Sequence, residues 1–313
     1  MRKKRFFSIE IDSQHERREG NVKRFLTRFT PYLFLAPAIF IFGFILLYPV
    51  FYGITLSFFQ WALRDIGAKA PLFVGLKNYI EIFQSPYFLT SVRVTSIFIG
   101  VTMVAELGIG MALALLAERK TRGLHIFRTI FILPVMIAPI VVGIVWRYLY
   151  NPTYGLINYF LAIVGIKQIM WLSQSHTALA SIIITDIWQW TPFVFLILLG
   201  GLQTIPDEII EVSKIDSANY FQRLIYIKLP MIKPIIGITV VLRLIDAMRA
   251  LVVMYIMTFG GPGLSTEVLA LHIFKTAFHG QRLGRASAMS VFLILFMLTV
   301  AFGVLRIFRT ERR

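Results

Sequence analysis

Cysteine is absent from the 313 residues, and histidine occurs only five times. The lack of cysteine excludes disulfide bonds, thiol nucleophiles and thiolate metal sites. The histidines and the few carboxylates form no HExxH motif or other metal-ligand spacing, and the sequence has neither a GxxxxGKS/T phosphate loop nor a nucleophile elbow. The sequence therefore predicts no enzyme activity, no catalytic residue, no metal site and no cofactor bound by this chain.

Charged residues are also scarce. They make up 15% of the chain, whereas hydrophobic residues make up 57% and the mean hydropathy is +0.74. Soluble globular proteins are about 25% charged and about 45–50% apolar. This composition predicts an α-helical membrane protein that crosses the bilayer several times.

Six apolar stretches reach the length of about 20 residues that a helix needs to cross a hydrocarbon core of about 30 Å. The first exceeds the hydrophobic part of a cleaved signal peptide and lacks a small-residue cleavage site, so we expect a retained helix. We predict an all-α membrane domain over residues 31–308, with helices at 31–59, 91–117, 127–150, 177–200, 234–259 and 286–308.

The net charge of +16 is spread unevenly along the chain. Cytoplasmic segments of membrane proteins carry an excess of lysine and arginine. These residues gather at 1–30, 119–128, 214–233 and 306–313. We therefore expect cytoplasmic tails at 1–30 and 309–313, both termini and the loop at 204–233 in the cytoplasm, and no nucleic-acid partner.

Charged side chains inside membrane helices are costly and normally face the bundle interior or a wet cavity. Arg243, Asp246 and Arg249 follow one another at a spacing of three, which places Asp246 between the arginines on one helical face. Asp186 and Glu106 lie within two other predicted helices. Such residues form either a network that fixes helix packing or the lining of a translocation path; we favour the path, except for Glu106, where both interpretations stay open.

A second group on the fourth predicted helix points to a ligand class. Asp186, Gln189, Trp190 and Phe193 share one helical face because their offsets are three, four and seven residues. A carboxylate and an amide bind hydroxyl groups, and aromatic rings stack on the apolar faces of sugars. The group fits a polyol, with ordinary core aromatics around a buried aspartate as the alternative.

The polar loop at 204–233 is long enough for two short helices. Pro206 fits the first position of one helix, and the acidic residues that follow complement its positive end. Asp216 is a candidate cap for a second helix, with Ser217 at the corner, and Pro230 and Pro234 are expected to end that helix and begin the next span. The loop predicts a helix–turn–helix that docks on a cytoplasmic partner, the alternative being an amphipathic helix on lipid.

This loop resembles the EAAxxDGA…IxLP signature of the permease subunits of bacterial binding-protein-dependent ABC importers. Val212 and Ser213 replace the two alanines of the signature, and Ser217 replaces its glycine. The residues that match are Glu211, Asp216, Ala218, Ile227, Leu229 and Pro230. The segments PYLFLAPA, NPTYGLIN, DIWQWTPF, LGGLQTIPDEIIE and TFGGPGLSTEVL resemble the subgroup that imports sugars and glycerol phosphate.

The resemblance implies a type I ABC importer permease fold with six membrane helices and a coupling helix between the fourth and fifth. It implies a bacterial plasma (inner) membrane protein with four kinds of partner: an extracellular or periplasmic solute-binding protein, a second homologous permease, two ATP-binding subunits that use the ATP, and a sugar substrate. Glu211, Asp216, Ser217, Ala218, Leu229 and Pro230 would form the coupling site. Positions lining the sugar path in the related maltose permease correspond to Asp186, Gln189, Trp190, Phe193, Arg243 and Asp246, and Arg249 completes the set.

Two alternatives stay open at this point. The same architecture could import glycerol 3-phosphate or another polyol, because Arg243 and Arg249 could meet a phosphate, although Asp186 and Asp246 favour a neutral ligand. A carrier that works without ATP would need an inverted repeat or a gate of its own, and the sequence shows no repeat.

Overall fold

The computed structural model describes residues 30, 32, 34–67, 70–118 and 124–308. Apart from Thr30, the two predicted tails lie outside the described residues. The chain divides into two compact units, Met1–Thr55 and Leu56–Arg313, which are described separately.

The first unit contains an apolar helix that is described from Phe34 and contains the π-helical turn η1 (Gly43–Leu47) and α2 (Tyr48–Leu56). Its mean hydropathy is 2.3, and none of its apolar window is buried within the structure. The predicted end at residue 59 is wrong, because the helix ends at Leu56 and the chain then enters a strand.

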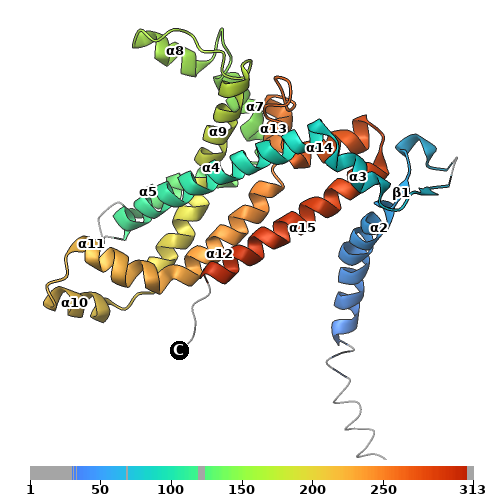
Figure 1. The fold of residues 1–313 in the computed structure, drawn as a ribbon. Helices are drawn as coiled ribbons and strands as arrows, with labels where there is room; N and C mark the ends of the chain where they lie inside the picture. Colours follow the sequence, from blue (N-terminus) through green and yellow to red (C-terminus); the bar gives the residue numbers. More distant parts are fainter. Residues whose placement is uncertain (1–29, 31, 33, 68–69, 119–123, 309–313) are drawn as a thin grey trace, which may run out of the picture. The chain divides into compact units, whose positions relative to one another are not determined.

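A small sheet follows at the start of the second unit, so the all-α prediction needs this correction. Strand β1 (Phe59–Gln60) pairs antiparallel with β2 (Leu72–Phe73), and the 3-10 turn η2 (Leu63–Asp65) lies between them. The short helix α3 (Lys77–Phe83) leads into the first long helix of the unit. Figure 1 shows this region beside the start of the last long helix.

Four helices form the body of the second unit: α4 (Pro86–Ala117), α9 (Ser175–Leu202), α12 (Leu229–Met248) and α15 (Leu283–Phe308). α4 packs against α9 and α12, and α12 packs against α15 (Figure 1). Buried apolar side chains from α4, α9 and α12, with others from the segment after α12, form one large core. A second core lies where the ends of α4 and α9 meet the beginning of α12.

Glycine lets α4 and α9 approach closely. A Cβ atom at Gly110 would lie 2.8 Å from Cγ1 of Val194, closer than side-chain atoms normally come. Such small residues are typical of membrane helix interfaces, where backbone proximity provides the packing energy. The contact aligns α4 with the face of α9 that holds the predicted site residues.

The third predicted helix, 127–150, is not one straight helix. The structure divides it into α5 (Leu124–Phe131), α6 (Leu133–Met136) and α7 (Pro139–Leu149), and Arg128–Met136 is bent by 98° from α7. Pro139 supplies no N–H and drives the residue before it out of the helical region, and Ala138 is indeed extended, with φ −58° and ψ 136°.

The fifth predicted helix, 234–259, also differs from the structure. It begins earlier, at Leu229, and α12 ends at Met248; a separate helix, α13 (Val252–Met257), follows after a break at residues 249–251. Pro234 therefore lies inside α12, not at its start. Two of the predicted membrane helices are therefore interrupted, the third between Met136 and Pro139 and the fifth between Met248 and Val252.

Three shorter elements complete the described chain: α8 (Leu156–Ile163), α14 (Leu269–Phe274) and the π-helical turn η4 (Lys275–His279). Among the described residues, four helices are long and apolar enough to span a membrane, or five if the bent pair is one span. α12 is not among them because Lys233, Arg243 and Asp246 raise its charge. Six spans stay a prediction.

Candidate functional site

A buried ion cluster joins three helices in the middle of the second unit. Arg243 on α12 donates hydrogen bonds from Nε to Oε2 of Glu106 at 2.6 Å and from Nη2 to Oε1 at 2.9 Å. The same Nη2 also donates to Oδ2 of Asp186 on α9. Arg243 is 1% exposed, Glu106 0% and Asp186 5%. One guanidinium therefore connects α4, α9 and α12 inside the fold.

Asp246 and Trp190 surround the remaining sides of Arg243. Nη1 of Arg243 lies 3.5 Å from Oδ2 of Asp246, one helical turn further along α12. The guanidinium carbon lies 5.1 Å from the centre of the Trp190 ring, which is within cation–π range. The side chain of Asp246 is 40% exposed, so this carboxylate can also meet a ligand.

Gln189 and Phe193 extend the cluster along α9. Nε2 of Gln189 donates to the carbonyl of Ile137 at 3.2 Å, at the break between α6 and α7. Oε1 of Gln189 is buried with no hydrogen-bond partner among the described residues. Phe193 meets the Trp190 ring edge-on, with ring centres 6.1 Å apart. The free amide oxygen leaves an acceptor for a donor group such as a hydroxyl.

Two residues depart from the predicted set. Arg249 is exposed just after the end of α12, and it makes no hydrogen bond or ion pair with the cluster among the described residues. Glu106, which the sequence left open between packing and function, makes two hydrogen bonds to Arg243. One indication of this role was visible in the sequence, a carboxylate inside a predicted membrane helix. Such a carboxylate is expected to pair with a cation from another helix.

Chemically, the cluster is rich in acceptors. Glu106, Asp186 and Asp246 surround the single guanidinium of Arg243, so carboxyl groups outnumber the cation. Carboxylate and amide oxygens beside an aromatic ring suit hydroxyl groups. No group of three or more histidine or acidic side chains in the described chain could hold a metal ion.

The second candidate site is the polar segment before α12, which begins with α10 (Asp207–Ile215). Pro206 is the residue before the helix, not its first helical residue as predicted. At the other end, Ala218 N–H donates to Ser213 C=O and Ser217 N–H to Lys214 C=O, both at 3.0 Å. This pair of hydrogen bonds is a Schellman motif.

Ser217 occupies the left-handed position of this motif, with φ 59°. Glycine is usual there because a side chain strains this conformation. The importer signature that this loop resembles has glycine at this position. The left-handed backbone of the turn explains that preference for glycine. Ser217 therefore keeps the turn geometry but carries backbone strain.

The second helix of the segment is capped by Asn219, not by Asp216 as the sequence predicted. The side chain of Asn219 accepts from the N–H of Gln222 at 2.9 Å, and Gln222 Oε1 accepts from the N–H of Asn219 at 2.8 Å, which is a capping box. Asp216 instead ends α10.

One helical path then runs from this cap into the membrane domain. α11 (Tyr220–Arg223) continues through the π-helical turn η3 (Leu224–Lys228) directly into α12. Pro230 lies in the first turn of α12, so the expected end of the second helix at Pro230 and Pro234 is wrong. Lys228 pairs with Glu118 at the end of α4 at 2.5 Å and ties this path to α4.

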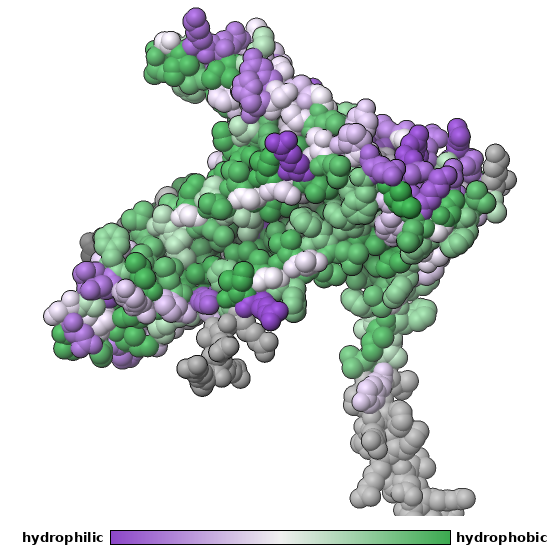
Figure 2. Space-filling model, in the orientation of Figure 1, coloured by the Kyte–Doolittle hydropathy of each residue, from purple (hydrophilic) through white to green (hydrophobic). Residues whose placement is uncertain are grey.

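The exposed part of the segment can contact a partner. Glu211, Asp216 and Ser217 are exposed, Ala218 is half-buried, and a hollow of about 330 Å³ lies beside Val212 and Ile227. Figure 2 shows hydrophilic residues at this end of the second unit, whereas hydrophobic residues cover its long helices. The segment therefore combines a polar surface with a firm attachment to α12.

Comparison with known proteins places the chain in a family. Residues 106–311 match the family described as binding-protein-dependent transport system inner membrane component. The trehalose/maltose transport system permease protein of Thermococcus litoralis is 35% identical over 240 residues, covering 77% of this chain and 81% of that protein. The sn-glycerol-3-phosphate transport system permease protein of Yersinia enterocolitica is 32% identical over 286 residues, covering 90% and 94%.

Solved structures agree with the fold. A chain of a bacterial ABC transporter involved in the import of the acidic polysaccharide alginate superposes with a TM-score of 0.80 at 21% identity, covering 94% of this chain and 100% of that chain. A chain of the alginate transporter in complex with an alginate pentasaccharide-bound periplasmic protein gives 0.78 at 22% identity, covering 91% and 96%. The chain belongs to the binding-protein-dependent transport system inner membrane components, the multi-pass permease subunits of ABC importers.

Proposed function

We propose that this permease carries a sugar or oligosaccharide, delivered by an external solute-binding protein, through a path beside the buried ion cluster. One observation carries the proposal. The polar segment from α10 to the start of α12, called the coupling segment below, is joined to Arg243 and Asp246 by a continuous helical path from Tyr220 to Met248. A movement received by the segment would reach the cluster through this helix. The relatives named for trehalose/maltose and glycerol phosphate support the solute class.

The cluster favours a neutral substrate. Each nitrogen of the Arg243 guanidinium donates to a carboxylate, so four of its five N–H groups are already used and one on Nη1 is left for a ligand. Oε1 of Gln189 and the half-exposed Asp246 instead offer acceptors to sugar hydroxyls. The residues proposed to line the path are Asp186, Gln189, Trp190, Phe193, Arg243, Asp246 and Arg249.

The segment before α12 is the proposed site of coupling to ATP. The residues assigned to it are Glu211, Asp216, Ser217, Ala218, Leu229 and Pro230. Two ATP-binding subunits on the cytoplasmic side would use the ATP, and a second, similar permease would complete the path. This arrangement places both termini in the cytoplasm and uses six membrane helices.

Reconstitution of the complete importer tests the proposal. Liposomes holding this chain, its partner permease and the ATP-binding subunits would be given the solute-binding protein and labelled maltose, trehalose or glycerol 3-phosphate outside, with ATP inside. We expect ATP-dependent accumulation of a neutral sugar. Accumulation of glycerol 3-phosphate alone would replace the substrate class, and uptake without the ATP-binding subunits would favour an ATP-independent carrier.

A further inference from the structure

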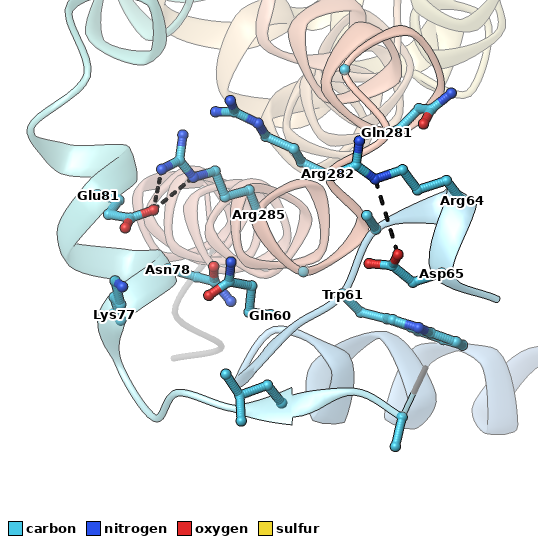
Figure 3. Close-up of a pocket in the computed structure, with 15 residues that line it drawn as sticks. Gln60, Trp61, Arg64, Asp65, Lys77, Asn78, Glu81, Gln281, Arg282 and Arg285 are labelled. Atoms are coloured by element: carbon cyan, nitrogen blue, oxygen red, sulfur yellow. Dashed lines mark hydrogen bonds and ion pairs between the residues drawn. The ribbon is translucent and has the colours of Figure 1, made fainter. Parts of the chain in front are cut away.

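A polar hollow of about 690 Å³, drawn in Figure 3, lies near the start of α4, whereas the coupling segment lies near the end of α4. It is bounded by the β1–β2 hairpin, by α3 and by the turn at residues 280–284 that begins α15. The 32-residue α4 starts beside this region and ends at the Lys228–Glu118 pair, so the two sites are about 48 Å apart along the helix. That distance exceeds the hydrocarbon core of about 30 Å.

The walls of the hollow are held by specific contacts. Nδ2 of Asn78 donates to the carbonyls of Ser57 at 2.8 Å and Phe59 at 3.0 Å, and Leu63 N–H donates to the carbonyl of Gln281 at 3.0 Å. A Cβ atom at Gly284 would lie 2.0 Å from the Phe59 carbonyl oxygen, so only glycine lets the strand lie against the helix. The hollow is therefore preformed.

Its side chains leave hydrogen-bond donors free. Oε2 of Glu81 accepts a hydrogen bond from Nε of Arg285 at 2.7 Å. Oδ1 of Asp65 lies 4.0 Å from Nε of the exposed Arg64. Lys77 and Arg282 also line the hollow but have no carboxylate partner among the described residues. The hollow therefore has more cationic side chains than carboxylates: Arg64, Lys77, Arg282 and Arg285 against Asp65 and Glu81.

Trp61 adds a further donor to the same wall. Its Nε1 is buried and has no acceptor among the described residues. A buried donor without a partner costs free energy until an acceptor arrives. Lys77 and Arg282, which line the open part of the hollow, favour a ligand that brings carboxylate oxygens.

We infer that this hollow, the outer socket, receives an acidic loop of the solute-binding protein that the importer depends on. The inference rests on the proposed orientation, in which the segments 60–90 and 260–285 face outward. The family requires such a protein, and the open volume fits several side chains of a loop. Opposite charges at a rim steer the partner and fix its register.

The test measures binding of the solute-binding protein encoded with the importer to the complete complex in nanodiscs of neutral phosphatidylcholine. The double variant Lys77→Glu, Arg282→Glu should raise Kd by on the order of tenfold and weaken its salt dependence. The charge-conserving pair Lys77→Arg, Arg282→Lys should retain the wild-type Kd. Assembly with the partner subunits is checked by gel filtration.

Three results would overturn the outer socket. The first is an unchanged Kd in the charge-reversed variant. The second is an equal loss in Lys167→Glu, an exposed lysine outside the hollow, which would indicate general charge attraction. The third is an effect seen only with phosphatidylglycerol, which would assign the hollow to lipid phosphate. Failure of the wild-type complex to bind the protein would instead count against the proposed function.

Discussion

Arg243 and Glu106 are 137 residues apart in the chain, yet the guanidinium holds both oxygens of that carboxylate, at 2.6 and 2.9 Å. A forked, two-bond contact fixes orientation as well as distance. With both side chains almost fully buried, the pair determines how α4 and α12 lie against each other. Asp186 adds α9 through the same guanidinium.

Removal of Glu106 should destabilise the permease strongly. Glu106→Ala leaves Arg243 buried without its main partner, and breaking a buried pair costs about 3–5 kcal/mol. We expect a large fall in the unfolding temperature, measured by tryptophan fluorescence in nanodiscs. The double variant Glu106→Leu, Arg243→Met should recover part of the loss, and Arg64→Ala, at an exposed pair, should have little effect. An unchanged midpoint in Glu106→Ala would contradict the assigned contact.

Asp186 should affect which solutes are transported. Asp186→Ala removes an acceptor beside the proposed path and frees a donor of Arg243, so uptake should fall or shift toward another solute. Initial uptake rates against concentration for several sugars would measure this change. Ile184→Ala, on the exposed side of α9, is the matched control and should leave uptake near the wild-type value. Identical kinetics in Asp186→Ala would remove this residue from the path.

Charge reversal in the coupling segment should separate ATP use from transport. Glu211 and Asp216 are exposed, so Glu211→Lys and Asp216→Lys should insert normally in the membrane. If the ATP-binding subunit docks here as proposed, they should lower ATPase stimulation by the loaded solute-binding protein, because a positive charge would replace a negative charge in the contact. Normal stimulation with either variant would exclude the docking role.

Ser217 provides a gain-of-stability prediction. Its φ of 59° is unstrained for glycine, so Ser217→Gly should stabilise the turn by about 0.5–1 kcal/mol. Ser217→Val should loosen it, because a β-branched side chain fits this region poorly. Hydrogen exchange of residues 207–223 would report both changes. Faster exchange in the glycine variant would show that the turn is held in another conformation.

Glu267 should make stability depend on pH in the acidic range. Burial alone would raise the pKa of this carboxyl, but hydrogen bonds from His272 at 2.6 Å and Lys275 at 2.5 Å outweigh it and lower the pKa below the ordinary 4.5. A lowered pKa in the folded state gives stabilisation that is present above pH 4.5 and is lost as pH falls through the lowered value.

Glu267→Gln tests this dependence. The variant should unfold at a lower temperature than the wild type at pH 7, and the difference between the two should shrink as the pH falls below 4.5. Tryptophan fluorescence melts across this range would measure it. A difference that stays constant with pH would mean that the contacts of Glu267 do not depend on its charge.

The sequence predicted the long helices at 91–117, 177–200 and 286–308 to within a few residues because their apolar runs are long enough to show each span. It failed at 127–150 because a proline such as Pro139 kinks or breaks a helix depending on its neighbours. It also failed at the break after Met248, where no proline or glycine marks the change.

The ion cluster was partly accessible to sequence reasoning. The spacing of three predicted that Arg243 and Asp246 share a face, and they lie 3.5 Å apart. The same spacing also placed Arg249 on that face, but α12 ends at Met248, so Arg249 lies just beyond the helix. Glu106 required a partner from a distant part of the chain, which periodicity within one helix does not reveal.

α11, η3 and α12 follow one another without a break, so a force applied to the segment before α12, as proposed, would act on them as on one rod. Pro230 and Asp246 are separated by about 24 Å along it, at about 1.5 Å per residue. If the helix pivots at the ion cluster, a tilt of about 10° over this length of about 24 Å would move the Pro230 end by about 4 Å. Under that proposal the length of the helix would set how far one end moves when the other tilts, and an insertion or deletion within α12 would change this ratio while leaving both ends chemically intact.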